Sequence, residues 1–199
     1  MSESLVCARD VAIERGYRCV LTGVNFTLQR GQILQLAGAN GAGKTSLLRA
    51  LAGLGRLGVT GQIERPESLL YLGHLPSTKP TLTPLENLRW HPSGQVANDD
   101  DAIVAALAAV SLAGYEETPI HHLSAGQQRR VALARLWLSD EPLWLLDEPF
   151  TAIDMLGAAL LEARLVGHID QGGGIIFTSH QPNRFGDRLR VLELSQYAA

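Results

Sequence analysis

The stretch at residues 38–46 restricts the fold of this chain more than any other. It reads Gly38-Ala39-Asn40-Gly41-Ala42-Gly43-Lys44-Thr45-Ser46 and fits the pattern G-x-x-x-x-G-K-[ST]. The apolar run at 33–37 is short enough for a buried strand, and leucines follow at helical spacing: Leu47, Leu48, Leu51 and Leu54. Glycines let such a loop turn its N–H groups inward, and the helix N-terminus adds partial positive charge. Strand, loop and helix in this order predict a polyphosphate site.

The last side chains of this loop have separate expected roles. We expect Lys44 to reach the β- and γ-phosphates of a nucleotide, and Thr45 to hold Mg²⁺ through its hydroxyl. Ser46 carries a second hydroxyl, which we expect only to satisfy the first helical turn. The alternative is a glycine-rich turn that binds no ligand, and the strand and helix on its two sides argue against it.

A second apolar run, at residues 143–146, ends in Asp147 and Glu148. Because buried parallel strands bring their carboxyl ends to one edge of a sheet, we expect both side chains to lie near the phosphate loop. Asp147 would bind Mg²⁺ directly or through water, and Glu148 would polarise the attacking water as general base. Acidic residues at a strand end are common in isolation, so the interpretation depends on their pairing with the lysine loop.

Three other residues allow both a functional and a structural interpretation. His180 follows a buried strand at 175–178. A histidine at such a place is often structural, but its position at the strand end favours a contact with the γ-phosphate. Ser124 begins a helix and is either a second anion-binding start or a plain serine cap. Tyr17 lies in the turn between strands expected at 4–13 and 20–28, and either stacks on an adenine ring or is an ordinary turn aromatic.

The composition excludes several classes of protein. At 199 residues the chain can bury one sizeable core with a smaller lobe attached. The net charge of −3 gives no global basic field, so we expect no direct nucleic acid binding. Cys7 and Cys19 are too few and too widely spaced for a zinc site or a redox pair. The chain shows no signal peptide and no run of about 18 apolar residues, so we expect membrane contact only through a partner.

The middle of the chain predicts an inserted lobe. Three prolines between residues 74 and 84 indicate an ordered surface loop, and a short helix opens at residue 85. Residues 92–98 are a polar linker, and the acidic run at 99–101 caps an alanine-rich helix at 102–112 rather than binding a metal. We therefore expect a single domain with a core at about 1–73 and 141–199 and a helical lobe at about 74–140.

Taken together, these motifs resemble those of ABC-transporter ATP-binding subunits. The resemblance covers nearly the whole chain. It includes the phosphate loop, the apolar strand followed by Asp147 and Glu148, and the two separate residues Asp154 and His180. It implies an α/β fold with a P-loop NTPase core, a mostly parallel sheet flanked by helices, a small antiparallel β part and an inserted helical subdomain. It also implies that ATP is hydrolysed with Mg²⁺ as cofactor.

The same resemblance implies roles that spacing alone does not reveal. Leu123-Ser124-Ala125-Gly126-Gln127 matches the signature motif, which faces the nucleotide of a second copy of the subunit. Asp154 matches the aspartate of the D-loop, and His180 the switch histidine. His74 stands where the family usually has a glutamine that contacts Mg²⁺. The usual adenine-stacking aromatic falls nearer Arg15 than Tyr17, and the segment between Gly61 and Leu69 looks shorter than usual.

Within the family, the residues from Leu123 to Leu138 and from Asp147 to Asp154 are most similar to the branch that serves cytochrome c maturation, long called a haem exporter. This branch implies a homodimer held by integral membrane permease subunits at the cytoplasmic face of the bacterial inner membrane. The alternatives are an ABC subunit for another cargo, a soluble regulatory or DNA-repair ATPase with the same dimer clamp, and an ordinary phosphate-loop kinase. A kinase has no use for the segment at 123–127.

Overall fold

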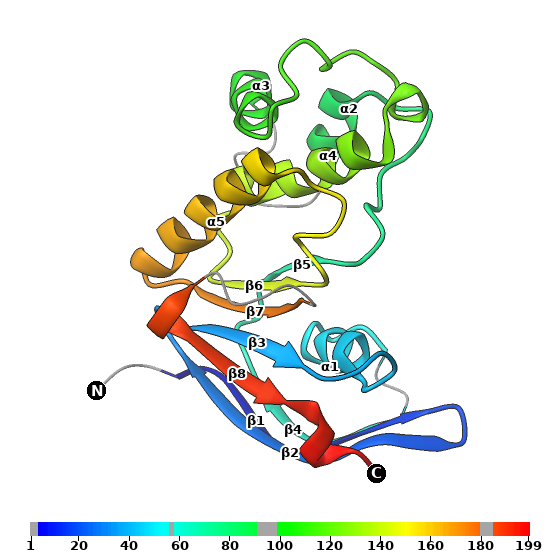
Figure 1. The fold of residues 1–199 in the computed structure, drawn as a ribbon, viewed down its shortest axis with the longest axis vertical. Helices are drawn as coiled ribbons and strands as arrows, with labels where there is room; N and C mark the ends of the chain where they lie inside the picture. The colour runs from blue at the N-terminus through cyan, green and yellow to red at the C-terminus, as the bar shows by residue number, and fades with distance from the viewer. Residues whose placement is uncertain (1–3, 56–57, 91–98, 180–184) are drawn as a thin grey trace. The chain divides into compact units, whose positions relative to one another are not determined.

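The computed structural model describes residues 4–55, 58–90, 99–179 and 185–199 (Figure 1). The chain divides into two compact units. Unit 1 comprises Met1–Tyr71, Pro142–Glu148 and His168–Ala199, and unit 2 comprises Leu72–Glu141 and Pro149–Gly167.

A parallel sheet lies at the centre of unit 1. Its strands, in spatial order, are β5 (Leu70–Leu72), β6 (Leu143–Leu146), β7 (Gly174–Thr178), β3 (Ile33–Ala37) and β8 (Leu189–Glu193). β3 pairs in parallel with both β7 and β8, and β6 pairs in parallel with β7. Every residue of β6 and β7 is buried, which explains why these strands are continuous apolar runs rather than alternating ones.

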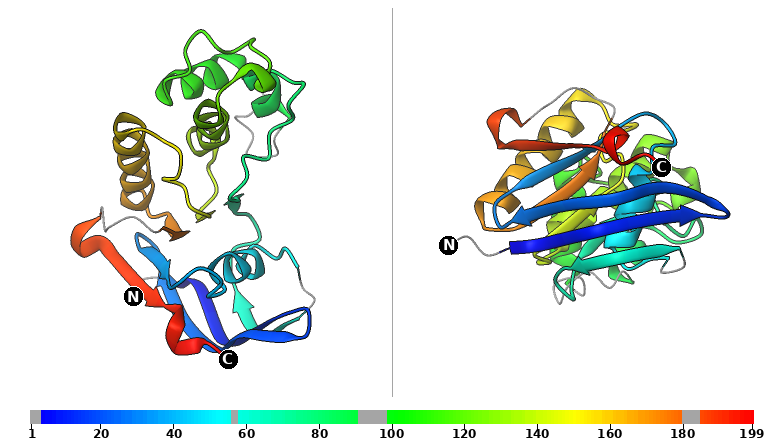
Figure 2. Two further views of the ribbon diagram at one scale, coloured as in Figure 1. Left: turned by 45° about the vertical axis from the view of Figure 1, so that its right-hand side comes forward. Right: turned by 90° about the horizontal axis from the view of Figure 1, so that it is seen from below.

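A smaller antiparallel sheet completes unit 1, with strand order β2 (Arg18–Gln29), β1 (Ser4–Arg15) and β4 (Val59–Glu64). Figure 2, right, shows these three strands side by side. Alternate residues of β1 and β2 enter one apolar cluster with residues of β3 and of helix α1 (Lys44–Leu51). The two short helices η3 (Gly186–Arg188) and η4 (Leu194–Tyr197) flank β8 in the sequence.

Unit 2 is helical. It contains α2 (Pro84–Arg89), α3 (Asp100–Ala109), the short η2 (Ile120–His122), α4 (Ala125–Leu138) and most of α5 (Met155–Asp170). Thr83 and Ser124 begin α2 and α4 with capping boxes, and Asp99 caps α3. Residues of α2, α3 and α4 share one apolar core. None of the helices in the described ranges has both the length and the apolar character that a membrane span requires.

The expected fold class is confirmed, and most elements form within two residues of their expected bounds. α1 ends at Leu51 because Gly53 follows, so Leu54 lies in the glycine-rich loop that the sequence indicates and is half exposed. One helix differs. α3 begins at Asp100 and ends at Ala109, two to three residues earlier than expected. The predicted linker at 92–98 lies outside the described residues.

The division into units differs from the expected one mainly at residues 149–167, and by only one or two residues at the other boundaries. The sequence places residues 149–167 in the core, whereas the structure groups Pro149–Gly167 with the helical unit. The physical reason is apolar packing, because α5 and α4 enclose a pocket between Leu133 and Leu161. A helix that follows a core strand therefore shares apolar packing with helix α4.

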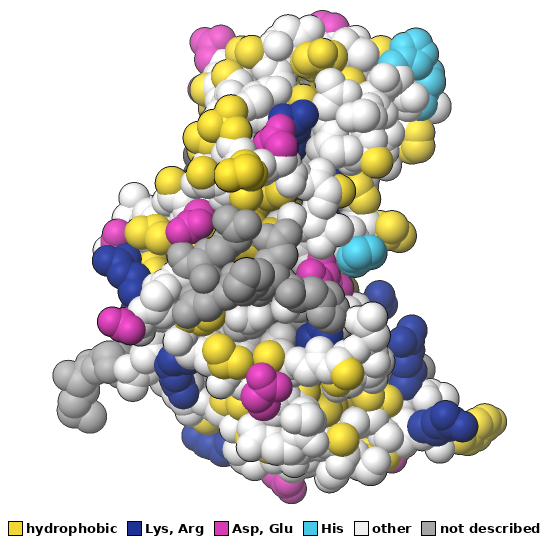
Figure 3. Space-filling view, in the orientation of Figure 1, with side chains coloured by type: hydrophobic (Ala, Val, Ile, Leu, Met, Phe, Trp, Pro, Cys, Tyr) yellow, Lys and Arg dark blue, Asp and Glu magenta, His cyan; other side chains and the backbone are white. Residues whose placement is uncertain are grey.

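On the face drawn in Figure 3, most Lys and Arg side chains lie over unit 1. They are separated by Asp, Glu and hydrophobic side chains rather than gathered in one patch.

Gly61 in β4 lies very close to the backbone of β1 in the antiparallel sheet. It has φ +88°, and an added Cβ would lie 2.3 Å from the carbonyl oxygen of Asp10, where the β1–β4 register shifts. Gly61→Ala should therefore lower the free energy of unfolding by about 2–4 kcal/mol, from backbone strain and the clash together.

The matched control is Gly55→Ala. Gly55 has nearly the same φ, +86°, but its added Cβ would meet nothing within 4 Å. Denaturant unfolding of both variants should show the larger loss for Gly61→Ala, by about 1 kcal/mol or more. Equal losses would mean that β1 can move away from β4 at Asp10 without cost.

Candidate functional site

The phosphate loop connects β3 to α1, as expected. Gly43 is the N-cap residue of α1 and has φ +93°. An added Cβ there would lie 2.9 Å from the side chain of Leu21 and 3.0 Å from that of Val20, so the close approach of β2 requires glycine. No side chain caps the first turn of α1, so its N–H groups face the loop. This is the arrangement in which a helix N-terminus binds phosphate.

Lys44 lies across the loop that precedes it. Its ammonium group donates to the carbonyl oxygen of Gly38 at 2.6 Å and to that of Ala39 at 3.1 Å. The side chain is 8 % exposed. A charged amine buried among backbone oxygens is a strong donor for phosphate oxygens, which carry more negative charge than carbonyls.

Asp147 is the centre of a hydrogen-bond network at the ends of two strands. The hydroxyl of Thr45 donates to Asp147 Oδ1 at 3.2 Å, and the hydroxyl of Thr178 donates to the same oxygen at 2.8 Å. Asp147 is only 2 % exposed. Because a buried carboxylate is stable only when its charge is compensated, these bonds hold Asp147 directly beside the start of α1.

Thr178 also orients the next residue, Glu148. The hydroxyl oxygen of Thr178 accepts a hydrogen bond from the Glu148 main-chain N–H at 2.9 Å. Glu148 has φ +52°, an uncommon conformation for a residue with a side chain. Such strain persists only where the surroundings enforce it, and it is concentrated at functional sites. Thr178 therefore fixes both acidic residues, although the sequence analysis did not single it out.

The charge of Asp147 also acts on Tyr71, in the neighbouring strand β5. Burial raises the pKa of Tyr71, and the negative charge of Asp147 raises it further.

The oxygens of Thr45 and Asp147 suit Mg²⁺. The hydroxyl and the carboxylate oxygen are 3.2 Å apart and lie at the start of the helix that would bind the phosphates. Mg²⁺ prefers hard oxygen ligands and usually takes one or two from the protein, with the rest from water and phosphate. The residues present therefore fit this ion.

A hollow of about 270 Å³ adjoins α1, and we call it the α1 hollow. It is lined by Ile13, Glu14, Arg15, Thr45, Ser46, Arg49, Leu54, Gly55 and Val59. Thr45 thus belongs both to the hollow and to the Asp147 network. Tyr17 does not line the hollow, and its side chain is fully exposed. Arg15 therefore lines the hollow together with Thr45, and which of Arg15 and Tyr17 contacts adenine stays a prediction.

The signature residues lie at the start of α4 in unit 2. The Ser124 hydroxyl accepts from the Gln127 main-chain N–H at 3.3 Å, and the Gln127 side chain accepts from the Ser124 N–H at 2.9 Å. The structure therefore shows the serine cap, and any phosphate contact is additional to it. An added Cβ at Gly126 would lie 3.0 Å from the carbonyl oxygen of Ala152, so the loop before α5 runs close to the first turn of α4.

Asp154 begins α5 in the same unit. Its Oδ1 accepts from the Gly157 main-chain N–H at 2.7 Å, which caps the helix as expected. Its Oδ2 lies 3.7 Å from a guanidinium nitrogen of Arg130 on α4. His74 also belongs to unit 2 and is exposed. His180 lies outside the described residues, so its contact with a γ-phosphate stays a prediction.

Comparison with known proteins agrees with this geometry. A sequence model described as ABC transporter matches residues 21–151, more than half of the chain. A solved structure titled as the ATP binding subunit of an ABC transporter has 25% sequence identity and a TM-score of 0.77. The similarity covers 88% of this chain and 79% of that one.

Two curated relatives are similar over almost their full length. Both are named cytochrome c biogenesis ATP-binding export protein CcmA. The protein of Pectobacterium atrosepticum is 50% identical, over 94% of this chain and 96% of its own. That of Escherichia coli K12 is 45% identical, over 96% and 97%. With the phosphate loop, the Asp147 network and these matches in agreement, the chain belongs to the ATP-binding subunits of the ABC transporter family, in the branch of CcmA.

Proposed function

We propose that the chain is the ATP-hydrolysing subunit of a membrane complex for c-type cytochrome biogenesis, in haem export or in release of a haem chaperone. The observation that carries the ATPase assignment is the bonding of Asp147 to both Thr45 and Thr178, because it joins the phosphate loop to the acidic strand end. The cytochrome assignment is supported by the names of the relatives.

Each residue of unit 1 would act through the atom that the structure presents. Lys44 would exchange its contacts with loop carbonyls for the β- and γ-phosphate oxygens, and the N–H groups of residues 38–46 would bind the remaining oxygens. Thr45 and Asp147 would hold Mg²⁺, which supplies positive charge to the phosphates when bound. The loop and helix thereby orient the γ-phosphate for attack.

Glu148 would act as general base. Its carboxylate accepts a proton from water as the water oxygen forms a bond to the γ-phosphorus, and the bond from that phosphorus to the ADP oxygen breaks. The products are ADP and inorganic phosphate. His180 would contact the γ-phosphate from the end of the next strand.

A second copy would complete each site. Ser124, Gly126, Gln127 and Asp154 of one copy would face the nucleotide held by Lys44 of the other, so that two copies associate head to tail. The exposed start of α4 supports this, because Ser124 and Gln127 use only part of their hydrogen-bonding capacity in the cap. Since the γ-phosphate bridges the copies, hydrolysis would release them.

The complex would be peripheral, at the cytoplasmic face of the inner membrane. A permease subunit would dock on the region at 75–95, where Leu75 is 74 % exposed and Trp90 is 76 % exposed. Large exposed apolar side chains are common at protein interfaces. Hydrolysis would then cycle the docked partner between two states. His74, in the usual position of a metal-contacting glutamine, would contribute to Mg²⁺ binding or to this coupling.

The experiment that tests this function uses a strain that lacks the chain. Reintroducing the chain should restore c-type cytochromes, and the chain should co-purify from membranes with a permease subunit of the same system. If membranes yield the chain with a permease for another cargo and c-type cytochromes form without it, the cytochrome assignment is wrong and the ATPase assignment stands.

Glu148→Gln should reduce ATP turnover by about 10²–10⁴-fold and trap ATP-bound dimers, because the amide cannot accept the proton. Single-turnover hydrolysis and size-exclusion chromatography with ATP measure both effects. Glu67→Gln, which makes the same change of charge in an exposed loop, should leave both unchanged. A normal rate for Glu148→Gln would show that Glu148 is not the base.

Thr178→Val should lower kcat by about tenfold and the free energy of unfolding by about 1–2 kcal/mol, because Asp147 and the Glu148 N–H both lose a partner. Thr22→Val, at an exposed position in β2, should change neither. Steady-state kinetics and urea unfolding test the prediction, and unchanged kcat in Thr178→Val would contradict it.

Arg15→Ala should raise the KM for ATP about threefold to tenfold with little change in kcat, because a guanidinium can stack on the base in the α1 hollow. Tyr17→Ala should leave KM unchanged, since its side chain is exposed outside the hollow. Titration with a fluorescent ATP analogue measures the affinity directly. A larger increase in KM for Tyr17→Ala than for Arg15→Ala would show that Tyr17, and not Arg15, contacts the adenine base.

A further inference from the structure

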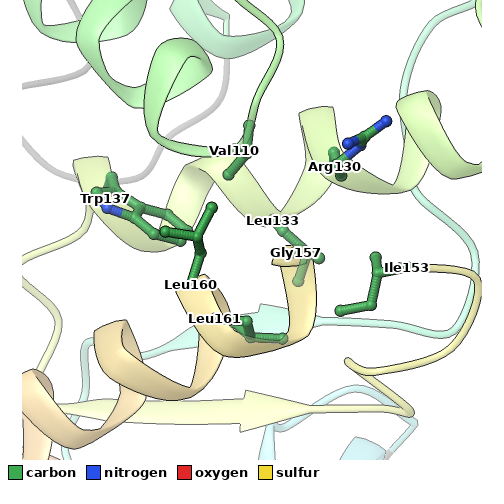
Figure 4. A pocket seen from close by; sticks show the side chains of 8 residues that line it. All are labelled: Val110, Arg130, Leu133, Trp137, Ile153, Gly157, Leu160 and Leu161. Atoms are coloured by element: carbon green, nitrogen blue, oxygen red, sulfur yellow. The ribbon is translucent and has the colours of Figure 1, made fainter. Parts of the chain in front are cut away.

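Helix α4 is buried on nearly every side within unit 2. Its residues contribute to the apolar core shared with α2 and α3. On another side, α4 and α5 enclose a narrow apolar pocket, where Figure 4 shows Leu133 and Trp137 of α4 close to Leu160 and Leu161 of α5. Because close-packed apolar surfaces resist deformation, α4 can shift only together with the helices around it.

Arg129 in the second turn of α4 is also buried, with 5 % of its surface exposed. Its Nη1 donates to the carbonyl oxygen of Gly73 at 2.8 Å and to that of His74 at 3.0 Å. Both acceptors belong to the stretch at residues 73–77, which we call the 73–77 segment. A buried guanidinium is costly unless it is hydrogen-bonded, so these carbonyls stabilise the charge while the charge fixes them.

Arg135, almost two turns later in α4, makes the same kind of contact. Its terminal nitrogens donate at 3.4 Å each to the carbonyl oxygens of Pro76 and Ser77. It is 3 % exposed, and burial lowers its pKa to about 10, which still leaves it charged at neutral pH. Ser77 has φ +53°, so the chain turns sharply where Arg135 holds it.

These bonds differ from apolar packing in their direction. A hydrogen bond weakens steeply when its angle changes, whereas apolar contact has no preferred direction. The four carbonyls of residues 73, 74, 76 and 77 are therefore held in a defined orientation relative to α4. The side chains of His74 and Leu75 are exposed on the same segment.

We propose that Arg129 and Arg135 are positioning residues that make the 73–77 segment move as one body with α4. A change at the Ser124 end of the helix then reaches the exposed His74 and Leu75. This inference rests on the proposed function, because ATP is assumed to bring a second copy against the Ser124 end of α4. It adds that the two buried arginines transmit that event to the surface that a membrane partner contacts.

Hydrogen–deuterium exchange of the full chain, with and without ATP and Mg²⁺, tests the proposal in the Glu148→Gln background. In that parent protein, ATP should slow the exchange of amides at both 123–130 and 73–79 by about threefold or more. When Arg129→Gln and Arg135→Gln are both added to this parent, the ATP response at 123–130 should persist and the ATP response at 73–79 should be lost. Replacing Arg129→Gln by Arg129→Lys in this variant, which keeps the charge, should restore part of the response at 73–79.

Arg164→Gln is the matched control. Arg164 also lies in unit 2, donates from Nε to the carbonyl oxygen of Leu136 at 2.9 Å, and has its pKa lowered mainly by burial. This hydrogen bond goes to α4 rather than to the 73–77 segment, so Arg164→Gln should leave both ATP responses intact.

Two outcomes in the variants would overturn the proposal. In the first, the variant with Arg129→Gln and Arg135→Gln exchanges faster at 73–79 without nucleotide but keeps the full ATP response there. The two arginines would then have a purely structural role. In the second, Arg164→Gln abolishes the response equally. If ATP slows exchange at 123–130 but not at 73–79 in the parent, only the transmission proposal fails. If ATP changes nothing at 123–130 in the parent, the dimer proposal fails and the transmission proposal fails with it.

Discussion

The buried carboxylate of Asp147 is the feature on which the rest of unit 1 depends. It needs hydrogen-bond donors because it is almost fully withdrawn from water, and it takes them from Thr45 and Thr178. Those bonds join the first turn of α1 to the ends of β6 and β7. Thr178 also accepts a hydrogen bond from the main-chain N–H of Glu148, which has a strained backbone conformation. One buried carboxylate thus holds together the residues for which we propose phosphate binding, metal binding and water activation.

The reliable parts of the sequence prediction are those in which a local pattern has one physical solution. A run such as Leu143–Leu146 followed by two acids can be satisfied only by a buried strand that ends at a polar edge. The loop before Lys44 likewise needs a strand before it and a helix after it. For this reason the parallel sheet, the phosphate loop and the position of Asp147 could be predicted from the sequence.

Other features depend on contacts that no local pattern encodes. Thr178 reads as one more residue of an apolar strand, and only the approach of β6 to β7 shows that its hydroxyl serves both acids. Arginine side chains on helices are usually exposed, yet Arg129 is buried against the 73–77 segment. For Thr178 and Arg129, tertiary packing decides the environment. Tyr17 is exposed in the hairpin, and its contact with adenine stays a prediction.

Unit 2 organises its polar contacts around one helix. α4 begins at the Ser124 capping box, contacts Asp154 through Arg130, and binds backbone carbonyls through Arg129. The serine cap and a phosphate contact are compatible, because a hydroxyl can both accept one hydrogen bond and donate another. Helix α4 of this chain therefore carries arginines that bind the backbone within unit 2, and we propose that its exposed start faces a second copy.

Mixing two inactive variants shows whether two copies share each nucleotide. Lys44→Ala disables the phosphate loop, and Ser124→Arg blocks the start of α4. In a head-to-tail dimer of one chain of each variant, a single site keeps both an intact Lys44 and an intact Ser124. We predict that neither variant hydrolyses ATP alone and that the mixture regains clear activity. If mixed dimers form but the mixture is no more active than the sum of the two variants, the sites are not shared between copies.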